Sequence, residues 1–163
     1  MFWFIRWLFV GMIGIIAVIV ITGFAIFKVT DFPKDSMLNS YNKVIEFFGD
    51  DSLTSDKKLK GNREFGIDKY VGTYKADYHN FTSEEIIFGG TTLHRKNGDH
   101  ITLKIVLEKQ SGNIDVINKL GNNEISLISD TGEYEETIYI DGMSYYLTIK
   151  LDNFKGKIEI IAE

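Results

Sequence analysis

The chain has 163 residues and no cysteine, which excludes disulfides, thiol chemistry and cysteine-ligated zinc. All 23 acidic residues follow Lys28, together with 16 of the 18 basic ones, so this part carries a net charge of −7. That charge disfavours nucleic acid as a partner, because phosphate neutralisation supplies most such affinity, and it disfavours attraction to anionic headgroups.

Residues 8–27 form a stretch of twenty uncharged, mostly apolar side chains. As a helix this stretch would extend about 30 Å, the thickness of a bilayer's hydrocarbon core. Trp3 and Trp7 precede it, where indole rings favour the headgroup region. The stretch is too long for a cleavable signal peptide, and bulky residues stand where a cleavage site needs small ones. We predict an uncleaved single-pass membrane anchor over residues 1–28.

Two opposing observations bear on the orientation of this anchor. Lys28, Lys34 and Lys43 follow the span whereas Arg6 precedes it, and the positive-inside rule then favours a cytoplasmic domain. The short aromatic N-terminal tail and a downstream composition typical of exported β-domains favour the opposite. We predict a plasma-membrane protein with an extracellular C-terminal domain, and the cytoplasmic orientation is the alternative.

Residues 29–64 divide into a short juxtamembrane helix and a charged linker. Asp35 or Ser36 can cap a helix that runs to Phe48, and apolar side chains recur along it at helical spacing. The dense charge from Asp50 to Glu64 predicts a solvated linker or mobile loop.

From Tyr70 onwards the apolar pattern changes to two-residue alternation. Tyr70, Tyr74, Ala76 and Tyr78 share one face of a predicted strand. A second strand alternates from Ile101 to Leu107, and five shorter runs follow, at 114–117, 125–128, 134–140, 145–151 and 157–162. Turn residues separate these runs at 111–112, 121–123, 130–132, 141–142 and 152–156.

The strongest signals for tight hairpins are Asn97-Gly98 and Asp141-Gly142, because these residue types tolerate positive φ. With a further strand that ends at Ile86-Ile87-Phe88, before Gly89-Gly90, the runs predict eight or nine short strands. We therefore predict an all-β fold for residues 65–163, an antiparallel β-sandwich of jelly-roll or immunoglobulin-like type.

The C-terminal strands also resemble a known group of proteins. The stretches SGNIDVIN and GEYEETIYIDGMSYYLTIKLDNFKGKIEI are similar to the closing strands of small β-sandwich domains in uncharacterised membrane-anchored proteins and lipoproteins of Gram-positive bacteria. This resemblance is a pattern of strands and turns, without reactive groups. It implies a fold and a bacterial, membrane-bound location, and it transfers no site residues.

No motif in the sequence predicts a metal, a cofactor or a catalytic centre. His94 and His100 flank the Asn97-Gly98 turn without a third ligand at a fixed spacing, and a hairpin surface explains them. The acidic groups, Glu84-Glu85 among them, match no calcium-loop spacing and are expected to be solvated. Paired carboxylates for glycoside hydrolysis depend on distances in space and stay open.

Tyrosines are the remaining candidates, because tyrosine rings with nearby acids form good sugar-binding platforms. The candidate binding residues are Tyr74, Tyr78 and Tyr146, although most such rings in alternating strands fill a core. Tyr146 is expected to point outward, opposite the inward face of Tyr145 and Leu147.

These observations predict a non-enzymatic, membrane-anchored extracytoplasmic module that binds an envelope polymer, such as a glycan, or a partner protein. The alternative is an accessory subunit of a larger membrane complex. An envelope hydrolase is disfavoured because no nucleophile and base can be named.

Overall fold

The computed structural model describes residues 40–41, 44, 52–91, 95–140, 142 and 144–163. The chain divides into two compact units after Ser40, and the predicted anchor lies outside the described residues. Within the predicted juxtamembrane helix, Tyr41 and Val44 are helical and their side chains are exposed. In the described part of the chain, no helix is both long enough and apolar enough to cross a membrane.

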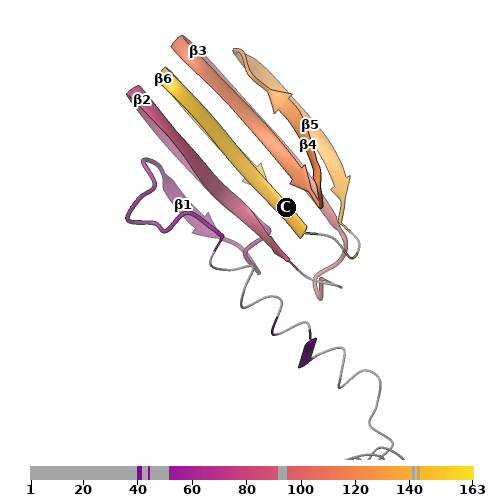
Figure 1. The fold of residues 1–163 in the computed structure, drawn as a ribbon. Coiled ribbons are helices and arrows are strands. Elements are labelled where there is room, and N and C mark those ends of the chain that lie inside the picture. Colours follow the sequence, from indigo (N-terminus) through magenta and orange to yellow (C-terminus); the bar gives the residue numbers. More distant parts are fainter. Residues whose placement is uncertain (1–39, 42–43, 45–51, 92–94, 141, 143) are drawn as a thin grey trace, which may run out of the picture. The chain divides into compact units, whose positions relative to one another are not determined.

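The described residues form one antiparallel sheet of six strands: β1 (Asn62–Phe65), β2 (Gly72–Thr91), β3 (His100–Leu120), β4 (Asn123–Ile128), β5 (Gly132–Tyr139) and β6 (Ser144–Ala162). β6 lies between β2 and β3, and β1 borders β2 (Figure 1). β4 and β5 both pair with the free side of β3, at different points along it. The predicted all-β antiparallel class is confirmed.

The three long strands β2, β3 and β6 bend along one line across the sheet. At the bend Asn80, Gly112 and Asn153 have φ angles of 54°, 74° and 48°, and the register between the strands shifts there. A Cβ atom on Gly112 would lie 2.1 Å from the carbonyl oxygen of Asn153, so this close approach requires glycine. The bend folds the sheet into two layers that face each other.

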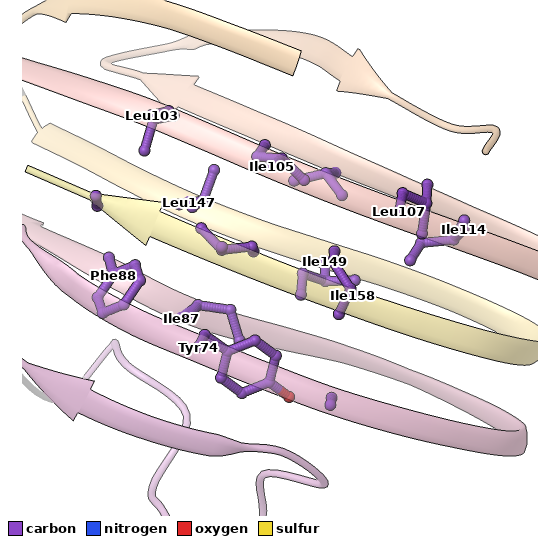
Figure 2. Close-up of a cluster of buried hydrophobic side chains, with 14 of the residues drawn as sticks. Tyr74, Ile87, Phe88, Leu103, Ile105, Leu107, Ile114, Leu147, Ile149 and Ile158 are labelled. Carbon is purple, nitrogen blue, oxygen red and sulfur yellow. The ribbon is translucent and has the colours of Figure 1, made fainter. Parts of the chain in front are cut away.

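The hydrophobic core lies between these two layers. Figure 2 shows side chains from both halves of β2, β3 and β6 that meet there, and the labelled ones are Tyr74, Ile87, Phe88, Leu103, Ile105, Leu107, Ile114, Leu147, Ile149 and Ile158. Most of these residues belong to the faces that two-residue alternation predicts, but Ile87 and Phe88 are adjacent and both buried, where the register of β2 shifts. Removal of this apolar surface from water is the main force that holds the layers together.

The bend corrects the prediction of eight or nine short strands. Turns were expected at 111–112 and 152–156, but β3 and β6 run through both positions. The residues there adopt positive φ, as turn residues do. The chain bends without reversing because each strand stays paired with its neighbour on both sides of the bend.

The prediction of a tight hairpin at Asn97-Gly98 is wrong. This turn connects β2 to β3, which do not pair with each other because β6 lies between them. The two-residue hairpin is formed instead by Gly121-Asn122, where Leu120 pairs with Asn123. The residue types mark a turn correctly, but the strand order decides whether the turn is a hairpin.

The connection from β2 to β3 is held by the buried side chain of Arg95. Its Nε atom donates a hydrogen bond to Asp68 Oδ2 at 2.8 Å, and Nη1 donates to the carbonyls of Gly98 and His100. Burial alone would raise the pKa of the Asp68 carboxyl, but hydrogen bonds from Arg95 and Asn97 outweigh it and lower this pKa.

Residues 54–61, here called the strap, correct the prediction of a solvated linker that ends at residue 64. Thr54 pairs with Ile86 of β2 through two hydrogen bonds, of 3.1 and 2.8 Å, and Leu59 is buried in the core. The strap then leads directly into β1, which begins at Asn62. The domain therefore begins before residue 65. Charge density misled the prediction because the lysines of the strap point to solvent, while Leu59, Thr54 and the backbone contact the domain.

Candidate functional site

Two of the three candidate tyrosines are core residues. Tyr74 and Tyr78 have exposed fractions of 0% and 1%, so they form no surface platform. Tyr146 is half-buried on the opposite face of β6 from Tyr145, as the alternation predicts, and its hydroxyl lies 3.0 Å from that of Thr91.

The hydroxyls of Tyr74 and Tyr78 converge on Glu85, whose side chain is 1% exposed. Both donate to Glu85 Oε2, at 2.8 and 2.5 Å, and the two hydroxyls are 2.8 Å apart. The backbone N–H of Lys60 donates to the other carboxylate oxygen at 2.9 Å. Glu85 thus accepts three hydrogen bonds in the core, which is how a buried carboxylate is stabilised.

This cluster connects the two layers of the sheet to the strap. Tyr74 and Tyr78 lie before the bend of β2 and Glu85 lies after it. Gly61 of the strap donates its N–H to the Tyr74 hydroxyl at 3.1 Å. Burial raises the pKa of both tyrosine hydroxyls, and the Glu85 carboxylate raises them further. The cluster is enclosed and holds the strap in place, so its role is structural.

Arg63 of β1 fixes the strap from the other side, and its side chain is 4% exposed. Its guanidinium donates to the carbonyls of Thr54 at 2.8 Å and Ile87 at 2.9 Å. It also forms an ion pair of 2.6 Å with Asp56. The strap is therefore bonded to β2 near both of its ends, at Thr54 and at Lys60 and Gly61.

One surface feature that could bind a ligand is a groove on the outer face of the sheet, where β2, β6 and β3 lie side by side. Its volume is about 410 Å³. It is lined by Lys75, Ala76, Asp77, Val106, Glu108, Lys157, Ile158 and Glu159. Lys75 and Asp77 line it because Tyr74, Ala76 and Tyr78 take the inward positions of β2.

Two cross-strand rows of side chains form the groove. In one row Lys75 pairs with Glu159, with 2.6 Å between Nζ and Oε1, and Val106 stands on the other side of Glu159. In the other row Lys157 lies between Asp77 and Glu108. Positive and negative groups therefore alternate along β2 and β6 and from β2 to β6, while β3 contributes the apolar Val106 and the acidic Glu108. Such a surface offers hydrogen-bond donors and acceptors for a polar ligand that carries both charges.

A second charged surface lies on the outer face of the other layer. Lys119 contacts Glu84 at 3.0 Å and Glu124 at 3.2 Å, and Lys150 contacts Glu124 at 3.2 Å. The hydrogen bond that Lys119 donates to the Glu84 carboxylate raises the pKa of the Lys119 ammonium. These groups pair with one another, as Lys75 and Glu159 do in the groove.

The remaining candidates from the sequence do not assemble into a site. His94 lies outside the described residues, and the ring of His100 lies against Tyr139 with 5.0 Å between centroids. Glu84 and Glu85, expected to be solvated together, lie on opposite faces of β2. Within the described ranges, no three histidine or acidic side chains are grouped as metal ligands.

Comparison with known proteins adds little to this picture. No family model and no curated protein matches the chain. Similar solved structures include BiXyn10A CBM1 in its apo form, with 12% identity and a TM-score of 0.31 over 64% of this chain and 86% of that one. Drosophila melanogaster CENP-C bound to CAL1 has 14% identity and a TM-score of 0.29, over 80% and 99% of the two chains. The C-terminal CBM6 of LamC from Zobellia galactanivorans has 11% identity and a TM-score of 0.25, over 69% of this chain and 95% of that one. These low similarities carry no functional conclusion for this chain.

Proposed function

We propose that this chain is a non-catalytic β-sandwich module that binds a polar, charged polymer in the groove across β2, β6 and β3. The observation that carries the proposal is the alternation of ammonium and carboxylate groups along a groove of about 410 Å³. A linear ligand with both kinds of charge could pair with successive groups of the two rows. An isolated apolar ligand would gain little there.

A binding role suits these acids better than catalysis does. Asp77 and Glu108 face each other across β6, with Lys157 between them. A glycosidase needs one carboxyl group kept protonated, usually by burial. The Asp77 side chain is 54% exposed and Glu108 is exposed as well, so neither acid has the burial that this role needs.

The proposal places the module at a bacterial plasma membrane, tethered by residues 8–27, with the domain outside. Support comes from the sequence: a span of bilayer length, interfacial tryptophans and a cysteine-free β-domain. In that location the ligand would be an envelope polymer. Peptide-bearing cell-wall sacculi carry both ammonium and carboxylate groups, which makes them the natural probe.

The test is co-sedimentation of the full chain, in phosphatidylcholine nanodiscs, with purified Gram-positive sacculi. We expect retention of the native chain and at least a tenfold weaker affinity for Lys157→Glu, which reverses the central charge of the groove. Lys155→Glu is the matched control, because Lys155 is exposed on the same strand but outside the groove. It makes the same change in net charge and should bind like the native chain.

Equal affinities of the two variants would show that binding does not use the groove. Absence of retention of the native chain would overturn polymer binding. The accessory-subunit alternative would then lead, and it predicts that the chain co-purifies with another membrane protein in mild detergent.

A further inference from the structure

A small pocket adjoins the groove at the bend of β2. Its volume is about 130 Å³, and Lys60, Asp77, Tyr78, His79 and Phe81 line it. The rings of Tyr78 and Phe81 are stacked at 5.8 Å between centroids, and the Lys60 Nζ atom lies 4.9 Å from the centre of the Phe81 ring. The pocket is thus built by β2 and by the strap, which the Glu85 cluster holds against it.

The pocket and the groove share one wall. Asp77 lines both of them, and its cross-strand partner Lys157 lies on the groove side. On the pocket side, Asp77 Oδ1 lies 3.6 Å from Nε2 of His79. A ligand that follows the groove along β2 therefore reaches the pocket at Asp77.

The charge around the pocket differs from that of the whole domain. Lys57, Lys58 and Lys60 are exposed on the strap, and the strap's single acid, Asp56, is paired with Arg63. Asp77 in the pocket wall has Lys157 as its cross-strand partner, so with the three lysines of the strap this part of an acidic domain is locally basic. The pocket has room for only a few atoms, since water takes about 30 Å³ per molecule in the liquid. Its volume, ammonium group and imidazole suit a compact anion on a side branch.

We propose that this pocket binds a carboxylate carried as a side group by the polymer in the groove. Lys60 Nζ supplies a charge-assisted hydrogen bond, His79 offers a second donor, and the stacked rings of Tyr78 and Phe81 form an apolar floor. The inference rests on the proposed function and adds to it a carboxylate on a side group of the polymer, bound outside the groove.

The experiment compares native sacculi with sacculi whose carboxyl groups have been converted to methylamides, using the full chain in phosphatidylcholine nanodiscs. We expect Lys60→Gln to weaken binding to native sacculi roughly tenfold, and to leave binding to amidated sacculi unchanged. Lys60→Arg keeps the charge and should retain most of the affinity. Lys58→Gln is the matched control, because it removes the same charge from the strap outside the pocket. Circular dichroism checks that each variant is folded.

The outcomes separate the two proposals. If Lys60→Gln and Lys58→Gln bind native sacculi equally well, or if the native chain binds amidated sacculi as tightly as untreated ones, the pocket does not bind carboxylate. A concurrent loss of binding in Lys157→Glu would leave the groove proposal intact. If the native chain is not retained by untreated sacculi, both proposals fail.

Discussion

Glu84 and Glu85 are adjacent in β2 and have opposite fates. Glu84 points to solvent and contacts Lys119 at 3.0 Å, within an ion-pair network on the outer face. Glu85 points between the two layers, is 1% exposed and accepts hydrogen bonds from Tyr74, Tyr78 and Lys60. The two side chains have the same chemistry, so the alternation of the strand alone separates them.

The contrast shows that burial decides how much a charged group contributes to the fold. Water can replace the partners of Glu84 at small cost, whereas nothing can replace Glu85 as the acceptor for three enclosed donors. The charged side chains of the outer faces can therefore exchange their partners for a ligand, or be substituted, at little cost to the fold. The inner cluster is expected to tolerate little substitution.

The largest expected effect on stability is that of replacing Glu85, and the same replacement of Glu84 is its control. Glu85→Ala leaves two hydroxyls and one backbone N–H without their acceptor and should lower the free energy of unfolding by at least about 3 kcal/mol. Glu84→Ala should change it by no more than about 0.5 kcal/mol. Urea denaturation followed by circular dichroism measures both. Similar losses in the two variants would contradict the contrast.

The same contrast between neighbours recurs on the strap. Leu59 is buried in the core and Lys58 is exposed. Leu59→Ala should cost about 2 kcal/mol of stability, because it removes a packed side chain and loosens the strap. Lys58→Ala should have almost no effect on the same denaturation curve. If Leu59→Ala were equally harmless, the strap would be a linker after all.

Alkaline pH should destabilise the domain through its buried tyrosines. Burial raises the pKa of Tyr74, Tyr78 and Tyr145 in the folded protein, whereas an unfolded tyrosine ionises near pH 10. The stabilisation is complete below pH 10 and declines as the pH rises above it, because the unfolded chain loses these protons first. Between the pKa of the unfolded tyrosine and that of the folded one, each such group should lower the free energy of unfolding by about 1.4 kcal/mol per pH unit.

The readout is the urea midpoint between pH 9 and pH 12. In Tyr78→Phe this midpoint should fall less steeply with pH than in the native protein, since one titrating group has been removed. Parallel profiles would show that Tyr78 does not titrate on unfolding.

The smallest effect is expected for the outer network. Lys119→Met removes contacts to Glu84 and Glu124 and should cost less than about 1 kcal/mol at low salt. In 1 M NaCl the difference from the native protein should almost vanish, because exposed ion pairs are screened. A loss that persists in high salt would mean that Lys119 contributes through packing.

The sequence predicts which side chains of several strands point inward, because alternation is a local property. The inward positions of Tyr74, Tyr78, Leu103 and Ile149 follow from the period alone. The bend could not be predicted in the same way. Positive φ at Gly112 is readable from the residue type, but whether the chain reverses or continues there depends on its pairing with β6.

Glu85 was missed for a related reason. Its neighbour Glu84 made the pair resemble solvated charge, and its inward position depends on register shifts in β2 that no local pattern declares. One signal was present: the hydroxyls of Tyr74 and Tyr78, on an inward face, needed an acceptor. The groove was equally hidden, because its two rows combine residues that lie up to 84 positions apart in the chain.

The central position of β6 has a consequence for biosynthesis. β2 and β3 pair with β6 and not with each other, so they stay unjoined until a ribosome has made residues 144–162. Until then both strands present open edges and apolar faces, the features that invite association with other chains. We expect the nascent domain to need a chaperone against aggregation during this interval. It should fold cooperatively once β6 pairs with β2 and β3.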